Sequence, residues 1–189
     1  MNGKNPAAPV APEFSRVYRL TQLKQQPLTV ELSADDAERT ALARRFGLVS
    51  LDQLDAEVVL TAEGEDVLAD GHLRAKVEQA CVATGESIAV TLYEPVNLRF
   101  SPEPDQVQDE ADEEMAESSA DIDDRDLVHF EEAAIDIGEA VAQTLLLSLD
   151  PYPRSPDADA FLKQKGVVSE EDAGPFGALA GLRDKLSGK

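Results

Sequence analysis

The sequence of 189 residues has one cysteine, two histidines and no tryptophan. A single cysteine excludes an intramolecular disulfide, which fits a reducing compartment. Residues 1–10 contain no continuous apolar segment of the kind that a signal peptide needs. No other stretch of the chain approaches the length of a membrane-spanning helix. We therefore expect a cytoplasmic protein that is neither secreted nor inserted into a membrane.

The sequence also lacks the motifs of common catalytic sites. It has no phosphate-binding glycine motif, no Gly-x-Ser-x-Gly and no His-Glu-x-x-His. His72 and His129 lie in segments typical of strands and belong to no recognisable motif, which favours structural or surface roles. Acidic residues are so abundant that their spacing says nothing about a magnesium site. We predict a non-catalytic protein with no catalytic residues and no cofactor.

Basic residues are few, with 17 Lys and Arg against 38 Asp and Glu, so the formal net charge is −21. A field of that sign repels the phosphate backbone of RNA unless positive charge is gathered into one patch. Residues 103–126 hold twelve acidic residues and one basic residue. Because this segment has few apolar side chains to bury, it cannot offset its ordering entropy. We predict that it is a disordered acidic loop.

Alternating apolar side chains predict three strands. The first covers residues 54–60, the second runs from His72 to Cys81, and the third covers residues 88–100. A turn at residues 84–86 joins the second and third strands into a hairpin, and Pro95 is predicted to mark a bulge or strand break. These strands are expected to form an antiparallel sheet.

Capping residues predict the helices. Ser33 is expected to cap a helix that runs to Phe46, with Asp36 in a variant of the capping box and Gly47 at the end. Asp136 is expected to cap a second helix over residues 137–149, with Glu139 closing a capping box. This second helix has the broadest apolar stripe, so we expect it to be the most buried helix and to pack across the sheet. A short helix is also expected at residues 157–165.

The hydrophobic content of 42% allows one moderate core. The predicted fold class is α+β, a single domain in which helices pack on an antiparallel β-sheet or a partly closed barrel, with the acidic insertion at residues 103–126. We place a flexible N-terminus at residues 1–14 and the domain at residues 15–165. Residues 166–189 are expected to form a flexible linker and a C-terminal amphipathic helix.

Cys81 stands at the mouth of the predicted hairpin, in the run from Cys81 to Glu86. A hairpin tip with Cys-x-x-Cys can supply two of the four ligands of a structural zinc ion. Here Thr84 occupies the place of the second cysteine, and its hydroxyl is a poor zinc ligand. We therefore predict no metal site, with Cys81 as the remnant of a Cys-x-x-Cys pair.

Five segments occur in one order: residues 81–84, the acidic stretch after Phe100, residues 135–147, residues 149–153 and residues 175–182. Together they resemble the YceD family, also called DUF177, the large ribosomal RNA subunit accumulation proteins of bacteria and plastids, over about residues 15–187. The resemblance implies a role in accumulation or processing of large-subunit ribosomal RNA and brings no catalytic residues. Many members have Cys-x-x-Cys and a further cysteine after the Pro-rich turn, and of these positions only Cys81 matches.

The resemblance and the charge together predict a ribosome-assembly factor that binds a protein or ribonucleoprotein partner. The partner is expected to be a large-subunit precursor or a basic ribosomal protein. The acidic loop either binds and shields such a basic protein or is only a solvated spacer. One alternative is a metal-dependent nuclease that processes RNA. Another is direct RNA binding through the basic positions of the first helix. The candidate interaction residues are Arg39, Arg44, Arg45, Phe176, Leu179 and Leu182.

Overall fold

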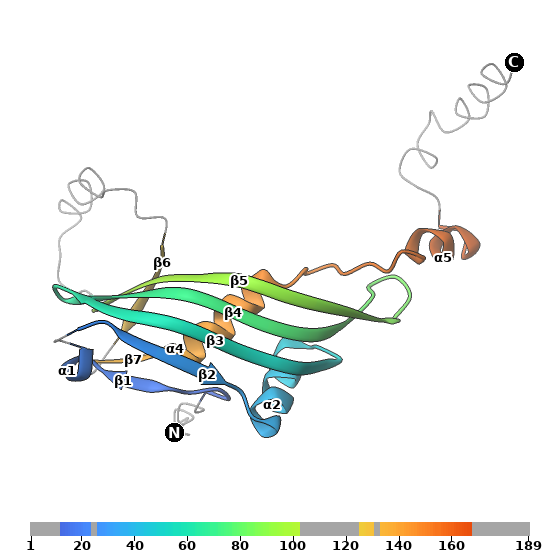
Figure 1. Cartoon of the computed structure of the whole chain (residues 1–189). Helices are drawn as coiled ribbons and strands as arrows, with labels where there is room; N and C mark the ends of the chain where they lie inside the picture. The colour runs from blue at the N-terminus through green and yellow to red at the C-terminus, as the bar shows by residue number, and fades with distance from the viewer. Residues whose placement is uncertain (1–11, 24–25, 103–124, 131–132, 168–189) are drawn as a thin grey trace, which may run out of the picture. The chain divides into compact units, whose positions relative to one another are not determined.

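The computed structural model describes residues 12–23, 26–102, 125–130 and 133–167 (Figure 1). The chain divides into two compact units. The first comprises residues 1–78 and 89–149, and the second comprises residues 79–88 and 150–189. The first unit contains most of the β-structure, and the second contains the hairpin tip around Cys81. None of the helices in the described ranges is long and apolar enough to cross a membrane.

The main sheet has five strands in the order β2-β3-β4-β5-β6. Their bounds are β2 Leu28–Ser33, β3 Ser50–Glu63, β4 Asp66–Ala80, β5 Ser87–Pro102 and β6 Asp126–Phe130. β3 is antiparallel to both β2 and β4, whereas β6 runs parallel to β5. The sheet is therefore mixed, and the prediction of a purely antiparallel sheet needs this correction. A parallel neighbour requires a crossover of a dozen or more residues, which residues 103–125 are long enough to provide.

A second, two-stranded sheet pairs β1 (Val17–Arg19) antiparallel with β7 (Ala134–Asp136). The helices are α1 (Leu20–Leu23), α2 (Asp36–Phe46), α4 (Ile137–Ser148) and α5 (Ala158–Gln164). The α+β prediction is confirmed, and the described strands form no closed barrel. α5 is the short helix expected at residues 157–165.

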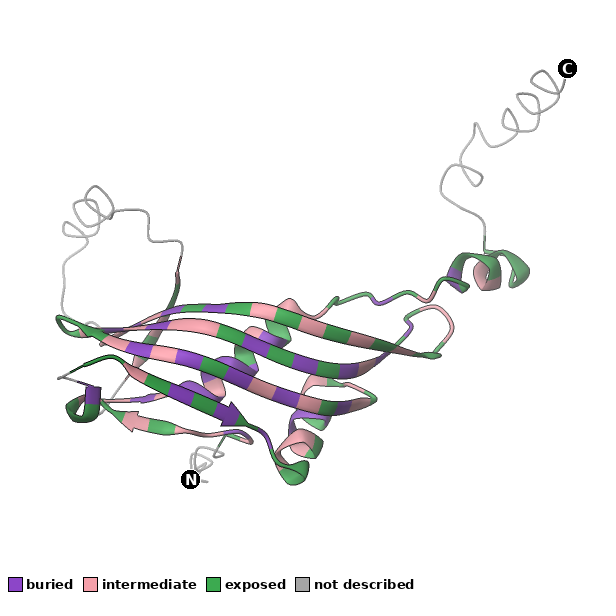
Figure 2. Ribbon diagram, viewed as in Figure 1, coloured by how far each residue is buried: buried purple, intermediate pink, exposed green. Residues whose placement is uncertain are grey.

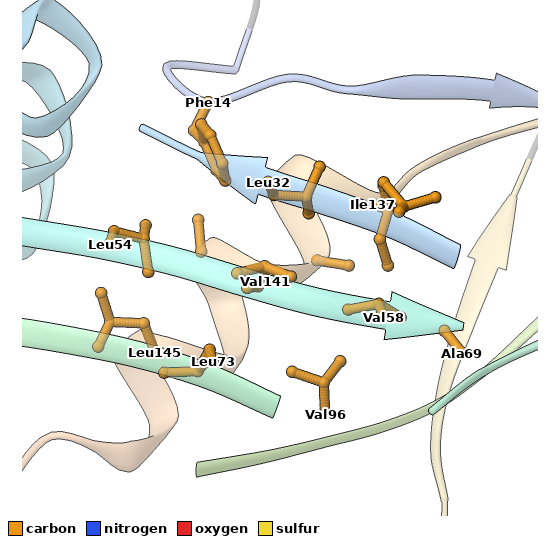
Figure 3. Packing of buried hydrophobic residues seen from close by; sticks show 14 of the residues in the cluster. Phe14, Leu32, Leu54, Val58, Ala69, Leu73, Val96, Ile137, Val141 and Leu145 are labelled. Atoms are coloured by element: carbon orange, nitrogen blue, oxygen red, sulfur yellow. The ribbon is translucent and has the colours of Figure 1, made fainter. Parts of the chain in front are cut away.

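The core of the first unit lies between the main sheet and α4 (Figure 1). Val141 and Leu145 of α4 are fully buried and point toward the same cluster as Val58 and Leu73 of the sheet (Figure 3). Buried and exposed residues alternate along the strands (Figure 2), because successive strand side chains point to opposite faces. Burying each such aliphatic side chain contributes roughly 1.5–3 kcal/mol. The prediction that this helix packs across the sheet is confirmed.

α2 begins later than predicted. Its N-cap is Asp35, whose carboxylate accepts the backbone N–H of Glu38, while Glu38 reaches back to the N–H of Asp35. The predicted cap Ser33 is instead the last residue of β2, and its hydroxyl donates to Asp55 at 2.7 Å. The predicted end is confirmed, since Gly47 has φ +68°, a conformation that favours glycine.

Asp136 caps α4 as predicted and also ties the N-terminal segment to this helix. One carboxylate oxygen of Asp136 accepts the backbone N–H groups of Gly138, Glu139 and Arg16, and the other accepts the hydroxyl of Ser15. The predicted capping box is wrong, because the carboxylate of Glu139 bonds to other partners, including the guanidinium of Arg45 at 2.6 Å. The ion pair between Glu139 and Arg45 takes the place of the predicted capping-box hydrogen bond between Glu139 and the backbone of Asp136.

Pro95 does not interrupt its strand, because β5 continues from Ser87 to Pro102. Within the part of the chain that the structure describes, β6 pairs only with residues 98–102 of β5. Pro95 therefore lies in a stretch of sheet edge, where a missing N–H is tolerated. The strand break predicted there is wrong.

Several predicted segments fall outside the described residues. These are the acidic residues 103–124 and the C-terminal residues 168–189 with their predicted amphipathic helix. The predicted acidic loop extends two residues too far, since Arg125 pairs with Asp70 and Asp126 begins β6. At the other end, Phe14 is 0% exposed within the core, although the predicted flexible N-terminus includes it.

Candidate interaction surface and the Cys81 turn

The side of the main sheet opposite α4 carries polar and charged side chains, and we call it the outer face. A groove of about 880 Å³ lies on this face. The side chains that define the outer face at the groove come from β2, β3, β4 and β5 and are those of Glu31, Ser33, Asp55, Glu57, Asp70, His72, Arg74 and Tyr93.

One row of side chains crosses the outer face on four neighbouring strands. Glu31 on β2 is directly opposite Glu57 on β3, and Glu57 is directly opposite His72 on β4. His72 stacks on Tyr93 of β5, with ring centroids 5.0 Å apart and planes 9° from parallel. No described residue forms a hydrogen bond or ion pair with the carboxylate of Glu31 or Glu57. The row therefore joins two uncompensated carboxylates to an aromatic pair.

The next row differs because its carboxylate has partners. Asp55 accepts hydrogen bonds from Gln53 at 2.5 Å and Ser33 at 2.7 Å, and these two bonds hold the pKa of Asp55 below its usual range. Arg74 is directly opposite Asp55, and its guanidinium lies 5.3 Å from the centre of the Tyr93 ring. Both rows converge on Tyr93, which is 57% exposed.

Gly71 allows β3 and β4 to approach closely beneath the groove. A Cβ atom at this position would lie 2.1 Å from the carbonyl oxygen of Glu57 and 2.7 Å from the Cα of Val58. Glycine inside a strand commonly marks such a close approach. The backbone of Gly71 itself lines the groove, between Asp70 and His72. Any side chain here would force the two strands apart.

Asp70, at one end of the groove, is already neutralised. The guanidinium of Arg125 donates to both of its carboxylate oxygens, at 3.0 and 3.3 Å. Glu31 and Glu57 are the acidic side chains of the groove that have no hydrogen-bond or ion-pair partner among the described residues, whereas Asp55 is hydrogen-bonded by the neutral side chains of Gln53 and Ser33. Asp55 and the two glutamates therefore all contribute to the negative potential of the outer face.

The three arginines predicted as interaction residues lie on α2. Arg39 pairs with Asp36 and donates to the carbonyl of Ala34, and Arg45 forms ion pairs with Glu13 at 2.9 Å and Glu139 at 2.6 Å. The Arg45 guanidinium holds the pKa of Glu139 below its usual range.

Two of these arginines share a pocket. Arg39 and Arg44 line a space of about 590 Å³ together with Asp36 and Asp52, and Arg45 does not take part. The structure thus places Arg39 and Arg44 at one pocket, where Arg39 pairs with Asp36, and holds Arg45 outside it by two ion pairs. The other predicted interaction residues, Phe176, Leu179 and Leu182, lie outside the described residues.

Cys81, in the second unit, is buried with 3% of its surface exposed. Its sulfur accepts the backbone N–H of Thr84 at 3.4 Å and that of Ser155 at 3.3 Å. The Thr84 hydroxyl and the Ser155 amide stabilise the thiolate and lower the pKa of Cys81 to about 6. The chain is held in place here by a bond from the N–H of Val82 to the carbonyl of Pro153.

The described residues that bond to the Cys81 sulfur are not zinc ligands. Zinc requires four ligands drawn from Cys, His, Asp and Glu. Among the described residues, no group of three or more such side chains is placed to hold a metal. The sulfur is instead approached by hydroxyl-bearing residues, Thr84 and Ser155.

The histidines also take no catalytic arrangement in the described residues. His72 belongs to the row on the outer face, and His129 is exposed on β6. Sequence reasoning placed His72 in a strand with a structural or surface role but missed its neighbours Glu57 and Tyr93. Strand alternation gives the face of each residue, whereas the register that aligns residues across strands depends on tertiary packing.

Comparison with curated proteins and comparison with solved structures returned no match. A family model described as large ribosomal RNA subunit accumulation protein YceD matches residues 69–183. This range is more than half of the chain and includes β4 from Ala69 onward, β5, β6, β7, α4 and α5, with Cys81, His72 and Tyr93, but not Glu31 or Glu57. The chain therefore belongs to the YceD family.

Proposed function

We propose that this protein is a non-catalytic factor of large ribosomal subunit biogenesis, which supports the accumulation or processing of large-subunit RNA by binding a protein or ribonucleoprotein partner. The family match over residues 69–183 carries the proposal. The family description names accumulation of the RNA and no chemical reaction. We propose that the protein acts in the cytoplasm, where large-subunit precursors are assembled in bacteria.

The charge of the chain favours a protein contact over a contact with RNA. With a net charge of −21, the molecule as a whole repels phosphate groups. On α2, two of the three arginines expected to attract RNA are engaged with carboxylates, Arg39 with Asp36 and Arg45 with Glu139. These pairs reduce the positive potential that the helix can offer to a phosphate backbone.

The proposal is tested by the ratio of large-subunit to small-subunit RNA in cells that lack the gene. We expect a selective fall in large-subunit RNA and recovery when the intact gene is returned. An unchanged ratio would remove the proposed function. Rescue by genes carrying Cys81→Ser or lacking residues 103–124 shows separately whether the thiol or the acidic segment contributes.

A second assay separates the proposal from the nuclease alternative. Purified protein is incubated with precursor ribosomal RNA in the presence of magnesium, and the RNA is separated by size. We expect the RNA to stay intact. Cleavage that disappears on removal of magnesium would contradict a non-catalytic role.

A further inference from the structure

We propose that the outer face binds a basic segment of a protein partner, with an arginine or lysine side chain of that segment lying between Glu31 and Glu57. This inference rests on the proposed function and specifies its partner and its contact surface.

Glu31 and Glu57 form an electrostatic arrangement that a partner cation would relieve. They face each other directly in an antiparallel pair, where opposed Cβ atoms lie roughly 4.5–5.5 Å apart. Like charges so placed destabilise a sheet. Both side chains are exposed, and neither carboxylate forms an ion pair with a described residue. A guanidinium or ammonium group between them would replace repulsion by two attractions.

The aromatic end of the row lies two strands beyond Glu57 and supplies a surface for a second basic side chain of the same segment. Tyr93 is more than half exposed and is held in place by stacking on His72. Long basic side chains lay their methylene stems along such apolar surfaces while the charged head remains in a polar environment. Arg74 already places its guanidinium near the Tyr93 ring, which shows that this ring accommodates a cation.

The size and charge of the groove indicate a segment of a chain. Its volume of about 880 Å³ is far larger than one ion requires, and it spans strands β2 to β5. Four carboxylates line it, those of Glu31, Asp55, Glu57 and Asp70, against one arginine, Arg74. A phosphate backbone would be repelled by this lining, whereas a lysine- and arginine-rich protein segment complements it.

The experiment measures binding of a fluorescent peptide composed of arginine, lysine and glycine to the full-length protein by fluorescence anisotropy. The test variant is the double substitution Glu31→Gln and Glu57→Gln. The matched control is Glu63→Gln with Glu65→Gln, which also removes two charges, from the exposed end of β3 and the adjoining turn outside the groove. We expect the test variant to bind about tenfold more weakly and the control to stay within about twofold of the unmodified protein.

A second pair of variants tests the aromatic end. Tyr93→Ala is expected to weaken peptide binding several-fold, and Tyr93→Phe, which keeps the ring, is expected to bind as the unmodified protein does. Circular dichroism of each variant checks that the sheet is retained. Equal weakening by Tyr93→Phe and Tyr93→Ala would contradict the role of the ring.

Three results would overturn the proposal. The unmodified protein could fail to bind the peptide, or the test and control charge variants could weaken binding equally. The third is that the unmodified protein binds an RNA oligonucleotide more tightly than the peptide and that the Glu31 and Glu57 substitutions weaken this RNA binding. Equal weakening would mean that net charge alone attracts the peptide. This assay does not measure ribosomal RNA, so the peptide can fail to bind while the RNA ratio in cells still supports the proposed function. Equally, the peptide can bind while the RNA ratio stays unchanged, which would contradict the proposed function alone.

Discussion

Glu31 on β2 and Glu57 on β3 are directly opposed residues of an antiparallel strand pair, and neither carboxylate has a positive partner among the described residues. Repulsion between two like charges that are directly opposed in a strand pair lowers the stability of the sheet. The neighbouring Asp55 shows the contrast, since Gln53 and Ser33 hydrogen-bond to its carboxylate. The acidic pair thus differs from Asp55 and Asp70 of the same groove, whose carboxylates have hydrogen-bond or ion-pair partners.

Removal of one charge from the acidic pair should stabilise the isolated protein. We expect Glu31→Gln to raise the free energy of unfolding by about 0.5 kcal/mol, because the cross-strand repulsion is lost. Urea denaturation checks this value. Glu65→Gln, in the β3–β4 turn, removes one charge without altering an opposed strand pair and serves as the control. A lower stability of Glu31→Gln than of this control would show that the repulsion is compensated.

Gly71→Ala should destabilise the protein strongly. The added methyl group would meet the carbonyl oxygen of Glu57 at 2.1 Å, so β3 and β4 must separate. We expect a loss of at least about 2 kcal/mol in the free energy of unfolding. Gly64→Ala is the comparison, since a Cβ atom there meets nothing within 4 Å and the cost comes only from φ +65°. That cost is about 1 kcal/mol, and an equal effect of both substitutions would contradict the steric explanation.

The thiol of Cys81 should titrate far below an ordinary cysteine. Absorbance of the thiolate near 240 nm, measured against pH, should show a midpoint of about 6 in the folded protein and of about 9.0 in denaturant. Because folding lowers this pKa, the thiolate's contribution to stability is present above the unfolded value and is lost as the pH falls through about 6.

Thr84 gives the matched variant for the titration of Cys81. Thr84→Val keeps the backbone N–H that bonds to the sulfur and removes the hydroxyl, which contributes most to the lowered pKa. We expect the midpoint of the folded variant to move upward, toward the ordinary value. If the unmodified protein showed the same titration midpoint of Cys81 when folded and when denatured, this turn would not stabilise the thiolate.

The pair of Arg16 and Glu38 should make stability depend on pH in the acid range. Two bonds of 2.7 and 3.0 Å join the guanidinium to the Glu38 carboxylate and lower its pKa. The stabilisation is therefore present above the unfolded pKa and is lost as the pH falls through the folded one. Glu38→Gln keeps a side chain that can complete the capping box but removes the charge.

We expect Glu38→Gln to cost about 0.5–1 kcal/mol at neutral pH, because the pair is partly exposed, and to cost progressively less in acid. Denaturant unfolding of both proteins between about pH 3 and pH 7 measures the difference in their free energies of unfolding. This interval covers the pH range over which a glutamate carboxylate titrates. A difference that stays constant across this range would assign the loss to the cap and not to the ion pair.

Local patterns in the sequence determined much of the fold. Strand alternation predicted residues 54–60 of β3, residues 72–80 of β4 and residues 88–100 of β5. Asp136 and Gly47 marked helix ends, and the apolar stripe of residues 137–149 predicted the helix that packs on the sheet. These signals depend on side-chain periodicity and on backbone caps, both of which act over a few neighbouring residues. The ordered segments also predicted the family that the comparison confirmed.

Only the tertiary structure decided which residues meet across the chain. The parallel pairing of β6 with β5, the ion pair that takes Glu139 away from a capping box and the alignment of Glu31, Glu57, His72 and Tyr93 all join segments that are distant in sequence. Sequence periodicity assigns a residue to a face but leaves the strand register and the sheet order open. Packing of the apolar face against α4 fixes that register, and the outer face then receives its row of charged and aromatic side chains as a consequence.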